Sequence, residues 1–160
     1  MKNSALIVFC LASLFSVGIA EGPRVGIDVL TGGVSTALVG VNTSAYELGL
    51  GYSSQSNDAS LKTEANVITF KGFLKDTLSK SVSLVYGAYY QLISGKVSGT
   101  FIDSASAIIA VVGVEYVLTD DLVLTVQYSP FASSSFKVSG TTMNASYLGS
   151  QVIIGGAFLL

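Results

Sequence analysis

The stretch "VEYVLTDDLVLTVQYS", residues 114–129, contains two apolar runs separated by an acidic turn, and it places a carboxylate, Glu115, inside the first run. Successive side chains of a β-strand point to opposite faces, so Val114 and Tyr116 share one face and Glu115 belongs to the other. Residues 119–121, Thr-Asp-Asp, are typical of a turn. The stretch therefore predicts an antiparallel hairpin with one continuous apolar face and a second face that carries Glu115.

The composition of the whole chain is apolar and sparsely charged. Of its 160 residues, 50% are hydrophobic and only 11% are charged, which is a low charge content for a globular domain. Eight basic residues stand against ten acidic ones, without a basic run. Nucleic-acid binding needs a concentrated basic surface, so we do not expect this class of function.

The first 20 residues have the pattern of a secretory signal peptide. Lys2 precedes an apolar run over residues 5–17, and small residues at 18 and 20 suit cleavage after Ala20. The only cysteine, Cys10, lies inside this apolar run, where we interpret it as a hydrophobic filler. After cleavage no cysteine would remain, so disulfides and thiol chemistry are not expected.

The remainder of the chain, residues 21–160, is predicted to be a single domain made of β-strands. No segment offers the roughly 18 consecutive apolar residues of a membrane-spanning helix, whereas alternation with period two recurs. In "YELGLGYS", residues 46–53, the tyrosines and leucines fall on one face and the glutamate, glycines and serine on the other. The same counting predicts eight strands, near 24–31, 34–42, 45–54, 66–75, 80–93, 106–118, 121–130 and 147–158.

The connections between these strands are predicted to alternate in length. Short turns are expected at 42–44, 75–81 and 119–121, and longer polar loops at 53–65, 94–105 and 130–146. Only the tight link between the first two strands departs from this alternation. The pattern is typical of an up-and-down arrangement whose two ends differ.

Two all-β architectures fit the alternation. A secreted soluble β-sandwich would bury one face of each strand and expose the other to water, but the less apolar faces here carry mainly Gly, Ser, Thr and Gln rather than charges. The apolar faces of eight strands would also exceed the apolar patch that a soluble monomer exposes. A closed transmembrane β-barrel fits better, because it leaves no unpaired backbone edge in the hydrocarbon.

At this point the chain resembles the small eight-stranded outer-membrane β-barrels of Gram-negative bacteria, of the OmpA-domain, OmpX and OmpW type. The resemblance lies in the signal peptide, the alternation, the order of short turns and long loops, and "VGVEYVLTDDLVLTVQYS", which looks like a periplasmic hairpin. In that family the last strand ends in an aromatic residue that the insertion machinery recognises. Here Phe158 is followed by Leu159 and Leu160, which departs from the pattern.

Two sets of candidate site residues follow from the faces of the strands. Ionisable residues on the inward faces are expected to fill the lumen as ion pairs or, alternatively, to line a narrow polar passage; they are Arg24, Asp28, Glu47, Lys71 and Glu115. Aromatic residues on the outward faces are candidates for the girdles that mark the edges of the membrane; they are Tyr46, Tyr52, Tyr86, Tyr90, Tyr116, Tyr128 and Phe158.

The resemblance implies a non-enzymatic protein that anchors in the outer membrane and displays polar loops for adhesion, envelope structure or protection. The alternatives are a narrow, porin-like channel or transporter for small hydrophobic solutes, and a secreted β-sandwich. The sequence has no histidine, so neither the usual acid–base catalysis nor a zinc site is expected, and no cofactor is expected. The expected partners are outer-membrane lipid, lipopolysaccharide and the insertion machinery, and the protein is expected to be a monomer.

Overall fold

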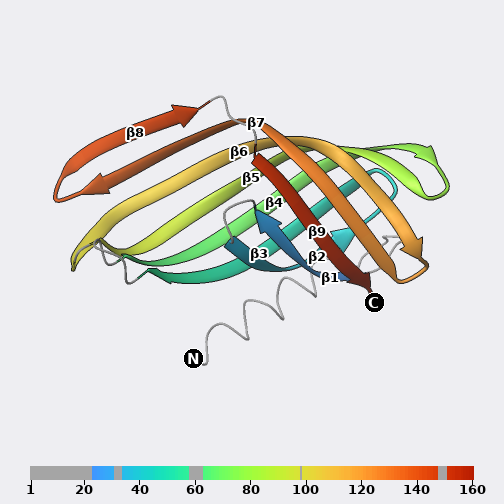
Figure 1. Cartoon of the computed structure of the whole chain (residues 1–160), viewed down its shortest axis with the longest axis horizontal. Coiled ribbons are helices and arrows are strands. Elements are labelled where there is room, and N and C mark those ends of the chain that lie inside the picture. Colours follow the sequence, from blue (N-terminus) through green and yellow to red (C-terminus); the bar gives the residue numbers. More distant parts are fainter. Residues whose placement is uncertain (1–22, 31–33, 58–62, 98, 148–150) are drawn as a thin grey trace.

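The computed structural model describes residues 23–30, 34–57, 63–97, 99–147 and 151–160, and the expected signal peptide, residues 1–20, lies outside them. The described residues form nine strands (Figure 1), which are β1 (Pro23–Leu30), β2 (Val34–Asn42), β3 (Tyr46–Asn57), β4 (Thr63–Ser79), β5 (Val82–Val97), β6 (Thr100–Thr119), β7 (Leu122–Val138), β8 (Thr141–Tyr147) and β9 (Gln151–Leu159). Within these ranges no helix is long and apolar enough to cross a membrane.

The strands close into an antiparallel barrel. Strands β1 to β7 pair in chain order, and β9 pairs with both β1 and β7, which closes the ring. Strand β9 pairs with residues 122–129 of β7, and β8 pairs with residues 132–138. Together β8 and β9 therefore hold the position of one strand, and the predicted all-β, up-and-down barrel of eight strands is confirmed.

The predicted last strand, 147–158, is wrong in its extent, because this wall position is shared by two strands. Pro130 lies between the segment of β7 that pairs with β9 and the segment that pairs with β8. Proline has no backbone N–H to donate, so it is tolerated where a ladder is interrupted. On its other side, β7 shifts register against β6 between Ala110 and Val112, at the same level.

The predicted long loops are also wrong in large part, because most of their residues continue the strands. Strand β3 runs to Asn57, β5 to Val97, and β7 and β8 meet at a two-residue turn, Ser139–Gly140, whose φ angles are both positive. Such a turn matches the twist of a hairpin. The Ser- and Thr-rich composition suggested loops, yet polar side chains suit a strand whose outer face meets water.

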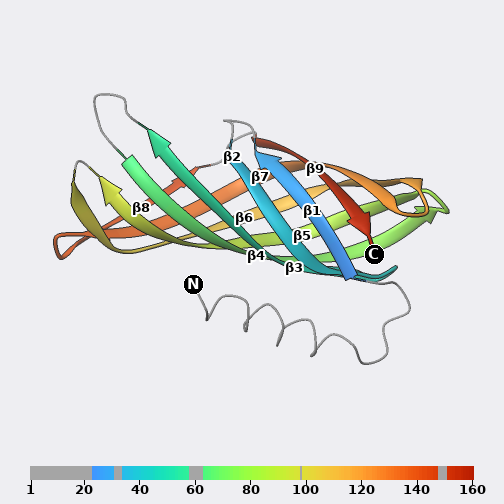
Figure 2. The same ribbon diagram turned by 90° about the horizontal axis from the view of Figure 1, so that it is seen from below.

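The two ends of the barrel differ. The turn end holds the connections at 43–45, 80–81 and 120–121. At the opposite end, here called the hairpin end, β1 and β2 stop early while the other walls continue (Figure 2). Strand β3, for example, pairs with β2 only up to Tyr52 but with β4 up to Asn57. The barrel wall is consequently low over β1 and β2 and high elsewhere.

The strands of the barrel have an apolar outside and a mixed inside. In the opening hairpin, Tyr116 is exposed and Glu115 is buried, and Gly113 lies on the same face as Glu115. A Cβ atom added to Gly113 would stand 2.3 Å from the carbonyl oxygen of Val126 on the neighbouring strand. Only glycine allows this close approach, which fits a site of tight bending in a barrel.

The buried charge cluster

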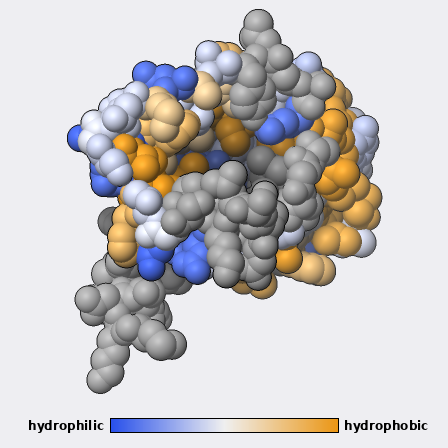
Figure 3. Space-filling view, turned by 60° about the vertical axis from the view of Figure 1, so that its left-hand side comes forward, coloured by the Kyte–Doolittle hydropathy of each residue, from blue (hydrophilic) through white to orange (hydrophobic). Residues whose placement is uncertain are grey.

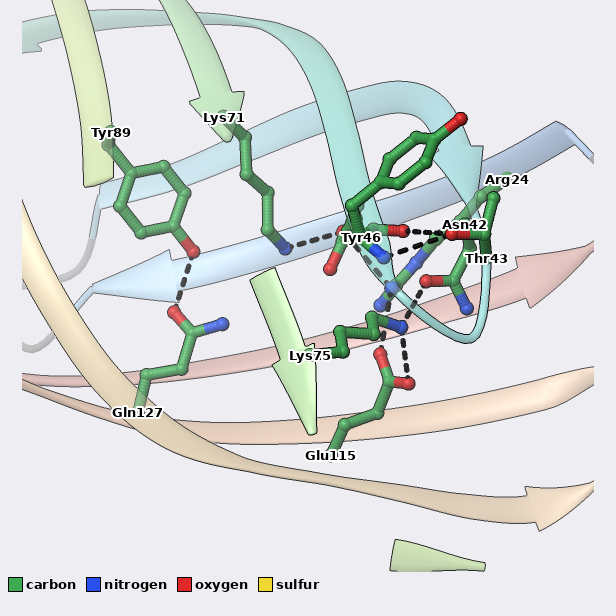
Figure 4. Close-up of polar contacts among 10 residues, drawn as sticks. Arg24, Asn42, Thr43, Tyr46, Lys71, Lys75, Tyr89, Glu115 and Gln127 are labelled. Carbon is green, nitrogen blue, oxygen red and sulfur yellow. Dashed lines mark hydrogen bonds and ion pairs between the residues drawn. The ribbon is translucent and has the colours of Figure 1, made fainter. Parts of the chain in front are cut away.

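The inner face near the turn end carries a network of ion pairs (Figure 4), which we call the charge cluster. Its members come from five strands and are Arg24 on β1, Asn42 on β2, Glu47 on β3, Lys71 and Lys75 on β4, and Glu115 on β6. All six residues are buried. The strands bring them together because each has a polar side chain at an inward position close to the same end of the barrel.

Arg24 joins the two carboxylates of the cluster. Its Nη1 atom lies 3.0 Å from Glu47 Oε1 and 3.1 Å from Glu115 Oε2. The guanidinium group suits this bridging position, because it is planar, permanently charged and rich in donors. One side chain from β1 thereby ties β3 to β6 across the interior.

The two lysines of β4 complete the network. Lys71 Nζ lies 2.8 Å from Glu47 Oε1, and Lys75 Nζ lies 2.5 Å from Glu115 Oε1. Lys75 also donates a hydrogen bond to Asn42 Oδ1. Each carboxylate is therefore contacted by two cations, as buried charges require if they are to remain ionised.

A short turn fixes two of these positions. Thr43 Oγ1 accepts a hydrogen bond from the backbone N–H of Tyr46 at 2.9 Å, and the Thr43 N–H donates to the Tyr46 carbonyl at 2.9 Å. The turn between β2 and β3 is held on both sides, so Asn42 before it and Glu47 after it point into the barrel at adjacent positions.

A second layer lies next to the cluster, toward the hairpin end. Tyr89 Oη donates a buried hydrogen bond of 2.8 Å to Gln127 Oε1. The Phe73 and Tyr89 rings meet edge to face at 5.1 Å, and Lys71 Nζ stands 4.8 Å from the centre of the Phe73 ring. A cation over an aromatic face is stabilised further. Apolar side chains continue this layer, with Ile109, Val111, Ala132 and Ile153 buried beside the two rings.

The interior beside the cluster has little free space. A cavity lined by Arg24, Glu47 and Lys71 has a volume of about 10 Å³, which is the space of roughly one water molecule. The side chains of the charge cluster contact one another across the interior beside this cavity, so the arrangement can hold opposite walls of the barrel together.

The structure thus places four of the sequence candidates, Arg24, Glu47, Lys71 and Glu115, in one network. The backbone of Asp28 pairs with Thr36 and Gly155, but its side chain lies outside the described part of the chain. Reasoning from the sequence missed Lys75 and Asn42, because each stood where a predicted strand (66–75 or 34–42) overlapped a predicted turn (75–81 or 42–44). The predicted turn at 75–81 is wrong, since β4 runs to Ser79, and the alternation through 71, 73 and 75 was the signal that could have placed Lys75.

The aromatic candidates lie on the outer face. Tyr46 is half-buried, and the other six are exposed, namely Tyr52, Tyr86, Tyr90, Tyr116, Tyr128 and Phe158. Tyr52 Oη donates to Asn66 Oδ1 on the next strand at 2.8 Å. Their role as a membrane girdle stays a prediction.

Comparisons with known proteins agree on the fold alone. No protein-family model and no curated protein matches the sequence. Among solved structures, Neisserial surface protein A (NspA) is 15% identical with a TM-score of 0.59, and the match covers 88% of this chain and 94% of NspA. A major outer membrane protein from Thermus thermophilus is 14% identical with a TM-score of 0.44, covering 88% of this chain and 100% of that one. The likeness to NspA shows that the two chains share a fold.

Proposed function

We propose that the protein is a non-enzymatic barrel of a bacterial outer membrane, anchored by its apolar outer face and sealed by the charge cluster. The observation that carries this proposal is that every wall strand exposes a large apolar side chain. Examples around the ring are Ile27, Val39, Leu48, Phe70, Tyr90, Val112, Val126 and Ile154.

Lipid is the environment that this surface fits. A contiguous apolar belt around a monomer is far larger than the few hundred Å² that a soluble protein leaves exposed. A membrane also demands that every backbone polar group be satisfied internally, which a closed ring of strands achieves. The pairing of β1 with β9 supplies this closure.

The charge cluster supports an anchoring role over a channel role. Eight strands enclose an interior that side chains just fill, and here the filling side chains are paired with one another across the lumen. The protein would then act by presenting its hairpin end outside the lipid, for adhesion or for protection of the envelope. A solute would have to break several ion pairs to pass.

Export, the surrounding lipid and membrane insertion are part of the proposed function. Residues 1–20 would direct export, outer-membrane lipid and lipopolysaccharide would surround the barrel, and the insertion machinery would assemble it as a monomer. The exposed Phe158 on β9 is the aromatic residue available to that machinery.

Gel mobility with and without boiling tests the barrel in the membrane. The protein is purified from outer membranes in mild detergent, and the unboiled sample is expected to migrate as a compact species that boiling converts to the unfolded one. Recovery of the native protein in the soluble secreted fraction would refute the anchoring role.

Planar bilayers test the seal separately. The wild-type protein is expected to give no stable conductance, because the ion pairs close the lumen. Steady channels in the wild-type protein would instead support the transport alternative. Asp120→Asn, a change in an exposed turn outside the charge cluster, is expected to give the same conductance as the wild type in either case.

A further inference from the structure

The two carboxylates of the charge cluster are paired differently. Both oxygens of Glu115 have a cation, since Oε2 lies 3.1 Å from Arg24 Nη1 and Oε1 lies 2.5 Å from Lys75 Nζ. Glu47 instead receives both of its cations on one oxygen, because Arg24 Nη1 and Lys71 Nζ lie 3.0 Å and 2.8 Å from Oε1. Its other oxygen, Oε2, is buried and accepts no hydrogen bond from the described residues.

A buried carboxylate oxygen needs a hydrogen-bond donor. An ionised carboxylate has about four positions at which it accepts hydrogen bonds, and a buried acceptor that stays unfilled is destabilising. Buried polar groups in proteins are satisfied either by other protein groups or by ordered water. Only 3% of Glu47 is exposed, so contact with bulk solvent does not supply the donor for Oε2.

The small cavity of the charge cluster lies beside this carboxylate. Its lining includes Glu47 together with the cations Arg24 and Lys71. Three glycines from neighbouring strands also line the cavity, and they are Gly26 on β1, Gly40 on β2 and Gly49 on β3. Gly40 pairs directly with Gly49, which pairs with Lys71 on its other side, so these residues share the inner face. The volume of about 10 Å³ admits one molecule of the size of water.

The charges around the cavity decide which molecule of that size fits. A simple anion has no hydrogen to donate to the carboxylate of Glu47, and a cation would meet the positive charges of Arg24 and Lys71. A hydrocarbon group would suit the hydrophobic side chains that cover one side of the barrel in Figure 3, but it also lacks a donor. Water both donates and accepts hydrogen bonds, so it can satisfy the carboxylate and a cation together.

We propose that the cavity binds one water molecule, which donates a hydrogen bond to Glu47 Oε2 and accepts one from Arg24 or Lys71. The water is then a member of the charge cluster and supplies the donor that the described side chains do not. It holds Glu47 through both carboxylate oxygens, as the cations hold Glu115. The site lies inside the barrel, so the inference does not depend on the proposed anchoring in a membrane.

Gly49→Ala tests the site, because its methyl group would take the place of the water without a clash. A Cβ atom at Gly49 would lie 3.4 Å from Lys71 Cβ and 3.6 Å from the Val39 carbonyl oxygen, which are ordinary contacts. At Gly40 the same atom would stand 2.1 Å from a backbone carbonyl oxygen, so that position does not allow the change. Gly72→Ala is the matched control, since it adds a methyl group to the outer face of β4 with no atom nearer than 3.9 Å.

Nuclear Overhauser measurements on the protein in detergent micelles detect a bound water through its contacts with backbone amide protons. In the wild type and in Gly72→Ala, the amide protons of the three glycines that line the cavity are expected to show such a contact. In Gly49→Ala the contact is expected to be lost at all three positions. Crystals of the wild type soaked in bromide, which anomalous X-ray scattering locates, test for an anion in the same place.

Each outcome either supports or overturns the bound water. Absence of the contact in the wild type would overturn it, and so would a contact that is unchanged in Gly49→Ala. A bromide peak in the cavity would overturn it in favour of an anion site. If Gly49→Ala does not fold, the wild-type crystal decides, because an ordered water beside Glu47 Oε2 supports the proposal and a dry cavity refutes it. The boiling shift of each variant reports on the barrel independently of the water.

Discussion

The barrel and its hairpin end follow the same alternation with opposite polarity. In the barrel, Ile154 faces outward and Glu115 inward. At the hairpin end, the outer pair is Ser135 and Asn144, and the inner pair is Phe136 and Met143. The period of two is fixed by the strand, whereas the polarity of each face is fixed by what it touches. One sheet can therefore serve lipid at one level and water at another.

The largest effect is expected from breaking the charge cluster. Glu115→Gln removes the only carboxylate that the described residues place against Lys75 and one of the two at Arg24. Leaving buried cations without their partner costs about 3–5 kcal/mol. Urea unfolding of the barrel in lipid vesicles measures the loss.

A double variant supplies the control for this prediction. Lys75→Met added to Glu115→Gln is expected to recover part of the lost stability, because an apolar side chain then replaces an unpaired cation. If Glu115→Gln unfolds at the wild-type urea concentration, the cluster does not hold the walls together.

A single charge on the outer face sharpens the contrast between the two levels. Ile154→Lys puts a cation where the barrel is expected to meet hydrocarbon, at a cost of about 2–4 kcal/mol near the membrane centre. Ser135→Lys, on the outer face of the hairpin end, is expected to change the unfolding free energy by less than about 0.5 kcal/mol. Equal losses of unfolding free energy at both positions in vesicles would contradict the prediction that residue 154 faces hydrocarbon and residue 135 does not.

The contrast between the barrel and its hairpin end also shows which parts of the structure the sequence can predict. Alternation alone placed Glu115 and Tyr116 on opposite faces, because a strand permits no other arrangement. It could not find the ends of the strands, since runs such as Ser133–Ser135 read as loops when only their polarity is considered. Lys75 was missed because the predicted strand 66–75 ended at this residue and the predicted turn 75–81 began there, whereas β4 continues to Ser79. Contacts between distant strands, such as Arg24 with Glu115, depend on barrel closure, which no local pattern encodes.

Close packing of the wall predicts a moderate effect at one glycine. Gly113→Val would force a side chain against the Val126 carbonyl, and overpacking of this kind costs about 1–3 kcal/mol. Gly156→Ala is the control, because an added Cβ there would meet nothing within 4 Å. The urea midpoint should fall for the first variant only, and a fall of the same size in both would show that the close approach is not the cause.

The smallest effect is expected at the turn between β7 and β8, at the hairpin end. Asp103 Oδ2 accepts a hydrogen bond of 3.0 Å from the Gly140 N–H, so this β6 carboxylate holds the turn between β7 and β8. Asp103→Ala should loosen the turn by about 0.5–1.5 kcal/mol and speed hydrogen exchange at Gly140, with the global urea midpoint unchanged. Ser104→Ala, the adjacent exposed residue, is the control. A lowered global midpoint in Asp103→Ala would mean that the hairpin end folds as one unit with the barrel, and the two levels would then differ in polarity but not in stability.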